Sequence, residues 1–206
     1  MVGLKPALQD ICLKLVIDFA RPCGCWHKAK LCGLIGFTGH EAYFINIELV
    51  SSHSSLTLAD ADQIIDEVLK LRLKHDLLPL AVVVLDSGGH VVSFKREDGC
   101  GILRHDIAIG KAWASLGMGM PTRQIRDRLA NRPTFQAALS AASGGRFIPT
   151  PGGVLIVNQQ GLAIGAVGIS GDASDKDEYC AIEAIKLAGF IAEPPMPAEN
   201  WNDGQL

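Results

Sequence analysis

The sequence is poor in aromatic residues, and its basic residues are not concentrated in any one segment. Aromatic side chains account for 6% of the 206 residues, which argues against the base-stacking surfaces that bind single-stranded nucleic acid. The net charge is −3, and the 19 lysines and arginines are scattered along the chain. A nucleic-acid-binding protein needs basic residues gathered on one face. We therefore expect no nucleic-acid partner.

Long apolar runs are also absent. No run approaches the ~18 residues that indicate a membrane span. Near the N-terminus, Lys5, Asp10, Lys14 and Asp18 interrupt every stretch that could supply the ~7–15 apolar residues of a signal-peptide core. We expect a soluble, cytoplasmic protein without a membrane partner.

Cysteine is unevenly distributed, with six residues at Cys12, Cys23, Cys25, Cys32, Cys100 and Cys180. A disulfide framework would spread its cysteines through a small domain, so a reduced compartment fits better. Cys23, Cys25, His27 and Cys32 offer soft ligands for zinc, but their spacing matches neither paired knuckles nor a zinc finger. Incidental thiols in a loose segment are the favoured interpretation.

A change in composition near His53 divides the chain. Residues 1–50 show no sustained period, and the serine-rich run at 51–55 is typical of a linker. We predict an N-terminal extension over residues 1–55, with a poorly ordered chain as one interpretation. A main domain follows over 56–192, and a C-terminal tail over 193–206.

The periodic patterns of the main domain predict helix, hairpin, helices, hairpin and helix. Thr57 and Asp60 resemble a capping box at the start of the first helix, which runs to about His75. The other predicted helices cover 103–116, 122–130, 133–142 and 175–191, and the hairpins pair 80–85 with 91–96 and 154–158 with 162–169. Because hairpins require antiparallel pairing, the fold class is predicted to be α+β.

Four motifs in order resemble the GlcG-type haem-binding (haem-degrading) family, which also forms the C-terminal half of some corrinoid adenosyltransferases. They are LAVVVLDSGGHVVSFKREDG, IAIGKAWAS, GGVLIVNQQGLAIGAVGISG and DKDEYCAIEAI. The resemblance implies a profilin-like fold, with an antiparallel sheet of about five strands, helices on both faces and assembly into homo-oligomers. It also implies a haem or other tetrapyrrole ligand. One departure is Ala114, where the family often has threonine.

Two histidines are candidate haem-iron ligands. His90 follows the first hairpin turn, where its imidazole could ligate iron or act as a general base, or could simply hydrogen-bond turn carbonyls. His105 is the second candidate, and the alternative is that it forms a solvated helix face with Arg104. Arg96, Arg104 and Lys111 would supply cations for the haem propionates.

The loop before the second hairpin offers a further binding element. Gly152 and Gly153 follow a segment rich in glycine and proline, and their amides could bind an anionic ligand. Such loops are common, so this signal is weak by itself.

Lys111 is the candidate catalytic residue. Arg104, Ala108, Lys111 and Ser115 share one helical stripe, and the small alanines would let this helix approach the sheet. A partly desolvated lysine there could have a pKa in a catalytic range. The alternative is a lysine that extends to solvent or pairs with Asp98 or Asp106.

Several other acidic residues have structural interpretations. Asp98 could cap the segment that follows it, and Asp177 and Glu178 are typical carboxylates of a helix start.

Three functions are compatible with these residues. The first is a small haem- or tetrapyrrole-binding protein linked to haem handling or degradation. The second is an enzyme that acts on a small carboxylate or hydroxy acid, with Lys111 and an anion clamp from Arg96 or Arg104. The third is an accessory subunit without a pocket of its own. The sequence leaves open whether the protein is an enzyme.

Deleting residues 1–55 should leave the thermal unfolding of the main domain nearly unchanged, because the patterns that build its core begin at Leu56. Calorimetry of the full chain and the truncated chain measures this. A large loss of stability on truncation would contradict the predicted boundary.

Overall fold

The computed structural model describes residues 30–34, 44–48, 50 and 52–205. The chain divides into two compact units, residues 1–53 and 54–206. In the first unit, β1 (Lys30–Leu34) pairs antiparallel with β2 (Phe44–Glu48), two strands that the sequence patterns did not predict. Most of the predicted extension, with Cys23, Cys25 and His27, lies outside the described residues. Among the described helices, none is long and apolar enough to cross a membrane.

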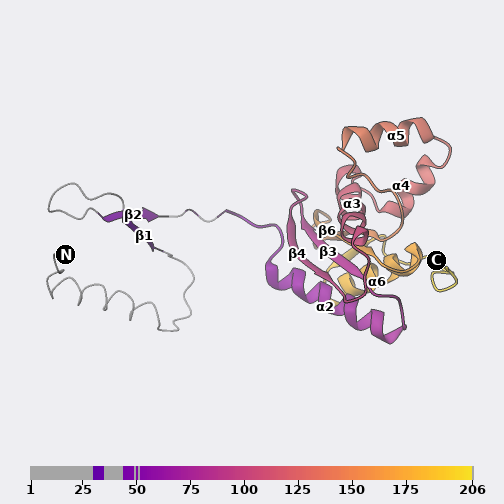
Figure 1. Ribbon diagram of the computed structural model, residues 1–206, viewed down its shortest axis with the longest axis horizontal. Coiled ribbons are helices and arrows are strands. Elements are labelled where there is room, and N and C mark those ends of the chain that lie inside the picture. The colour runs from indigo at the N-terminus through magenta and orange to yellow at the C-terminus, as the bar shows by residue number, and fades with distance from the viewer. Residues whose placement is uncertain (1–29, 35–43, 49, 51, 206) are drawn as a thin grey trace, which may run out of the picture. The chain divides into compact units, whose positions relative to one another are not determined.

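The second unit is built on a five-stranded, fully antiparallel sheet with strand order β4-β3-β6-β5-β7 (Figure 1). The strands are β3 (Ala81–Asp86), β4 (Val91–Arg96), β5 (Gly153–Val157), β6 (Ala163–Ser170) and β7 (Ile191–Glu193). Both predicted hairpins are present, and β3 and β6 pair to join them. The prediction of an α+β fold with about five antiparallel strands is therefore confirmed.

Five helices accompany this sheet, and they cover both of its faces. They are α2 (Leu58–Lys74), α3 (Leu103–Met118), α4 (Thr122–Leu129), α5 (Pro133–Ala142) and α6 (Ser174–Leu187). Helices α2 and α6 form one core with residues such as Val82 and Val84 of β3, whereas α3 packs on Val83 and Leu85 from the opposite face. Successive side chains of β3 point to opposite faces of the sheet, so they enter the two cores alternately.

Local sequence signals account for the ends of the helices. Thr57 accepts a hydrogen bond from the Asp60 amide, and the Asp60 carboxylate accepts one from the Thr57 amide, so the predicted capping box is present. Helix α3 begins without a side-chain cap, so the predicted cap from Asp98 is wrong. Glu97 has the structural role at this corner, because its carboxylate accepts a hydrogen bond from the Leu80 amide at 2.8 Å.

The closing helix is shorter than the sequence pattern predicts. It ends at Leu187 rather than at Ile191, and Gly189 follows with φ of +86°. Glycine takes this left-handed conformation without steric cost, so the chain turns there. Ile191–Glu193 then pairs with β5 as the fifth strand.

Close packing of α3 on the sheet depends on small residues. A Cβ atom added at Gly168 of β6 would lie 2.0 Å from the Ala108 carbonyl oxygen, and one added at Gly153 would lie 2.3 Å from the Lys111 carbonyl oxygen. The α3 backbone therefore rests directly on the strand backbones, as the small residues of the helix predicted. This contact fixes the middle of α3, around Ala108 and Lys111, against the sheet.

Replacing Gly168 by alanine should lower the free energy of unfolding by about 1–3 kcal/mol, the usual cost of forcing extra volume into a packed interior. The added methyl group has no space beside Ala108. Chemical denaturation measures the loss. The matched control is Gly101→Ala, because a Cβ atom there meets nothing within 4 Å. Equal stabilities for the two variants would contradict this account of the packing.

Candidate functional site

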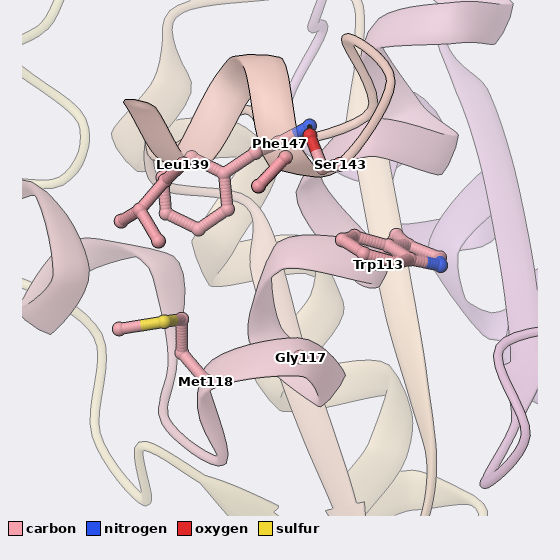
Figure 2. Close-up of a pocket in the computed structure, with 7 residues that line it drawn as sticks. Trp113, Gly117, Met118, Leu139, Ser143 and Phe147 are labelled. Atoms are coloured by element: carbon pink, nitrogen blue, oxygen red, sulfur yellow. Dashed lines mark hydrogen bonds between the residues drawn. The ribbon is translucent and has the colours of Figure 1, made fainter. Parts of the chain in front are cut away.

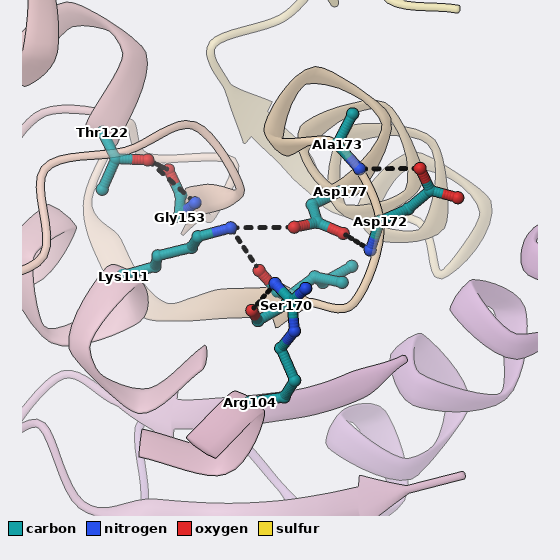
Figure 3. Close-up of polar contacts among 9 residues, drawn as sticks. Arg104, Lys111, Thr122, Gly153, Ser170, Asp172, Ala173 and Asp177 are labelled. Atoms are coloured by element: carbon teal, nitrogen blue, oxygen red, sulfur yellow. Dashed lines mark hydrogen bonds and ion pairs between the residues drawn. The ribbon is translucent and has the colours of Figure 1, made fainter. Parts of the chain in front are cut away.

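Lys111 lies in a buried polar cluster where α3 meets the end of β6 and the start of α6 (Figure 3). Its side chain is 2% exposed, and its Nζ donates to the Asp177 carboxylate and to the Ile169 carbonyl oxygen, each at 2.8 Å. The Asp172 amide donates to the other Asp177 oxygen at 3.2 Å. The predicted desolvation of Lys111 is confirmed, but the suggested partners Asp98 and Asp106 are wrong, because the lysine pairs with Asp177.

The ionisation of Asp177 is set by its burial and its partner. Burial raises the pKa of this carboxyl to about 6, and the attraction of Lys111 opposes that rise. A buried charge is tolerated when it is paired and hydrogen-bonded, as both groups are here. The arrangement links α3 on one face of the sheet to α6 on the other. Its geometry suits a structural ion pair, and the catalytic role of Lys111 stays a prediction.

Gly152 and Gly153 pack against this cluster. A Cβ atom at Gly152, which has φ of +111°, would lie 2.9 Å from the Lys111 Nζ. The Gly153 amide donates to the Thr122 hydroxyl at 2.9 Å, and that hydroxyl donates back to the Gly153 carbonyl oxygen at 3.2 Å. The Gly153 amide is thus occupied by the protein itself. Binding of an anion by these two glycines stays a prediction.

A second buried carboxylate lies between α4 and α6. Glu178 is fully buried, and neither of its oxygens has a hydrogen-bond partner among the described residues. The Arg123 guanidinium lies 3.3 Å from it, while Asp175 adds like charge. Burial raises the pKa of Glu178 to about 7. The predicted place of Asp177 and Glu178 near a helix start is confirmed, and the structure shows in addition that both side chains are buried.

An apolar hollow opens between α3, α5 and the loop that follows α5 (Figure 2). We call it the Trp113 hollow; its volume is about 170 Å³, and its lining includes Trp113, Gly117, Met118, Leu139 and Phe147. The Arg146 guanidinium lies 4.6 Å from the centroid of the Trp113 ring, in a cation–π contact. The hollow therefore combines an aromatic wall with a nearby positive charge.

His90 lies next to this region, on the β3–β4 turn. A smaller hollow, the turn hollow, is lined by Gly88 and Gly89 of this turn and by Trp113 and Gly117 of α3. A Cβ atom at Gly89 would lie 3.3 Å from the Trp113 indole. The His90 side chain is 82% exposed, and its Nδ1 lies 3.5 Å from the Asp86 carboxylate. Asp86 lies on the Nδ1 side of the ring, so Nε2 is the nitrogen that could act as a ligand.

The other residues predicted for the haem site lie at the start of α3 and at the end of β4. His105 packs edge-on against Phe94 at 4.7 Å between ring centroids, and its Nδ1 lies 3.3 Å from Asp106. Arg104 donates to the Ser170 hydroxyl at 3.3 Å. Arg96 is exposed at the end of β4. Trp113 follows Arg104 by nine positions, or about 13.5 Å at the α-helical rise.

The structure thus divides the predicted site residues into separate groups. Lys111, Gly152 and Gly153 form one buried group, which Arg104 adjoins through Ser170, and His90 follows Gly89, the turn residue that meets Trp113. Arg104 and His105 occupy the first turn of α3. None of the three described hollows is lined by His90, His105 or Lys111. The binding roles assigned to these residues stay predictions.

Sequence reasoning missed the residues that shape the hollows. Trp113 was present in the quoted helix motif, but no local pattern pairs it with Phe147 or with the turn at Gly89. Within the described part of the chain, no group of three or more histidine, cysteine or acidic side chains could hold a metal ion.

Comparison with known proteins identifies the class to which this fold belongs. Residues 56–186 match the family described as haem degrading protein HbpS-like, and the chain belongs to that family. A curated relative, the uncharacterized 15.0 kDa protein in the dhaT-dhaS intergenic region of Citrobacter freundii, is 26% identical over 132 residues, or 64% of this chain and 91% of the relative. The recognition of the haem-binding family from the four motifs is therefore confirmed.

Solved structures support the same fold. The Klebsiella pneumoniae protein ORFY is 26% identical, with a TM-score of 0.60 over 68% of this chain and 94% of that chain. The structure of a PduOC:heme complex is 23% identical, with a TM-score of 0.59 over 66% of this chain and 96% of that chain. At that identity the second likeness is evidence of fold alone.

The pH dependence of stability should reveal the buried carboxylate of Glu178. Its pKa is 4.5 in the unfolded state and about 7 in the folded state. The unfolded state therefore loses its proton at a lower pH than the folded state, and the free energy of unfolding falls as the pH rises from 4.5 through 7. Glu178→Gln should therefore be more stable than the wild type at pH 8, by on the order of 3 kcal/mol, and similar to it at pH 4.

Urea denaturation between pH 4 and 8 measures this difference. The matched control is Glu183→Gln on the same helix, because Glu183 forms a surface pair with Lys186 at 2.9 Å. Asp177 would still contribute pH dependence near 6 in both variants. Parallel curves for the wild type and Glu178→Gln would contradict the raised pKa.

Proposed function

We propose that this protein binds haem against the Trp113 hollow, and that His90 would hold the iron. The observation that carries the proposal is the position of the β3–β4 turn, whose Gly89, the residue before His90, lies against Trp113 of α3. Membership of the HbpS-like family supports a tetrapyrrole ligand, as does the related fold of PduOC, which was solved as a haem complex. Bound haem would supply an iron centre. The role that we propose for the protein is haem handling or degradation.

The chemistry of the surroundings fits a tetrapyrrole. A haem site needs a ligand for the iron, an apolar surface for the ring and cations for the propionates. His90 supplies an exposed imidazole, and Trp113, Leu139 and Phe147 supply apolar surface. Arg146 adds a positive charge over Trp113.

The size of the hollows indicates a shallow mode of binding. The Trp113 hollow and the turn hollow measure about 170 and 160 Å³, whereas pockets that enclose a ligand usually measure about 300–1,000 Å³. A haem would therefore lie against Trp113 with part of its ring in solvent. Such a site suits transfer or storage of haem, because the ligand can leave without unfolding its pocket.

The alternative of an enzyme for small carboxylates depends on Lys111. Its ammonium group is paired with Asp177 and lies 2% exposed, away from the described hollows. A substrate would have to displace that pair to reach the lysine. We therefore favour haem binding.

Titration with haemin should give a saturable Soret shift in the wild type, at one haem per chain, or one per two chains if the proposed homo-oligomer shares a site. His90→Ala should lose the shift or weaken binding at least tenfold, because the iron loses its ligand. His105→Ala is the matched control and should bind normally, because His105 packs against Phe94 at the other end of α3. A shift that does not saturate, or one that is lost only in His105→Ala, would contradict the proposal.

A further inference from the structure

A third hollow adjoins the Trp113 hollow and has a different chemistry. We call it the arginine hollow; it lies between the end of α3, α4 and the start of α5 and measures about 310 Å³. Its wall includes Met118, Ile125, Leu129 and Phe135, together with Arg128 and Arg132. Met118 lines this hollow and the Trp113 hollow alike, so the two are neighbours.

The two arginines of this hollow differ from Arg123 and Arg126 of α4 in their ion pairs. Arg123 pairs with Glu178 at 3.3 Å, and Arg126 pairs with Asp127 at 2.8 Å. Arg128 and Arg132, by contrast, have no side-chain ion pair or hydrogen bond with any part of the chain that the structure describes. Two guanidinium groups four residues apart are thus free to bind an anion.

The surroundings of these arginines select the kind of anion. A guanidinium group binds a carboxylate through two parallel hydrogen bonds. The rest of the wall is apolar, and Phe135 is a large hydrophobic side chain that is 48% exposed. An apolar wall with two free arginines suits a ligand that joins a hydrophobic body to a carboxylate.

We propose that the arginine hollow binds the carboxylate end of such an amphipathic ligand, with Arg128 and Arg132 as its anion partners. For the haem of the proposed function, on which this inference rests, that end is the edge that carries the two propionates. The five residues from Trp113 to Met118 span about 7.5 Å of helix, so one ligand can contact both hollows. The cations assigned here replace the predicted Arg96, Arg104 and Lys111.

The test compares haemin with haemin dimethyl ester, in which both propionates are esterified. Haemin should bind roughly tenfold or more weakly to the Arg128→Gln/Arg132→Gln double variant of the full chain than to the wild type, because hydrogen bonds to charged groups are among the stronger ones. The ester should bind the wild type and the double variant equally. The matched control is Arg96→Gln, an exposed arginine outside the hollow, which should bind haemin as the wild type does.

The outcomes separate this inference from the proposed function. Saturable haemin binding that is unaffected by the double substitution would overturn the inference and leave the haem site standing. If haemin does not bind the wild type, the proposed function fails, and calorimetry with laurate tests the hollow by itself. Laurate binding that is lost in the double variant would then support a site for an apolar monocarboxylate, and absence of laurate binding would overturn the inference.

Discussion

The close contact between α3 and the sheet is the constraint on which the rest of the domain depends. Gly153 and Gly168 let the helix backbone rest on the backbones of β5 and β6, and Ala108 and Ala112 keep the contact free of bulky side chains. The Lys111–Asp177 pair then ties the helix to α6 on the opposite face. Removing either partner would leave an uncompensated buried charge, which typically costs about 3–5 kcal/mol.

This fixed helix positions the three hollows. Trp113 contacts the β3–β4 turn on one side and the loop after α5 on the other, and Met118 separates the Trp113 hollow from the arginine hollow. Helix α4 is held in turn by contacts of Arg123 and Arg126 with the first turns of α6. The buried ion pairs of Lys111 and Arg123 therefore join α3 and α4 to α6, and the proposed binding surface lies on the part of α3 beyond Lys111.

Local patterns predicted the elements of this fold well, because their signals are local. Each signal lies within a few residues of the feature that it specifies. Examples are the capping box at Thr57, the apolar run of β3 and the glycines of its turn. The end of α6 and strand β7 were not predicted, because they depend on a turn and on a distant strand. The closing helix ended early because Gly189 permits a turn, and β7 forms only through pairing with the distant β5.

The candidate site was harder to predict, because its contacts span long stretches of chain. Lys111 and Asp177 are 66 residues apart, and sequence spacing gave no reason to join them. His90 and His105 were both candidate haem ligands, yet His105 packs on Phe94 at the start of α3, whereas His90 follows Gly89, which meets Trp113. The pairing of Arg123 and Arg126, which leaves Arg128 and Arg132 free within the described structure, also depends on tertiary contacts with α6.

Anomalous diffraction at the iron absorption edge, from crystals of the full chain grown with haemin, would test the proposed haem site most directly. The account predicts one strong iron peak within bonding distance of the His90 imidazole, with the tetrapyrrole ring against Trp113. An iron peak beside His105 at the start of α3, or ordered haem away from both hollows, would contradict it.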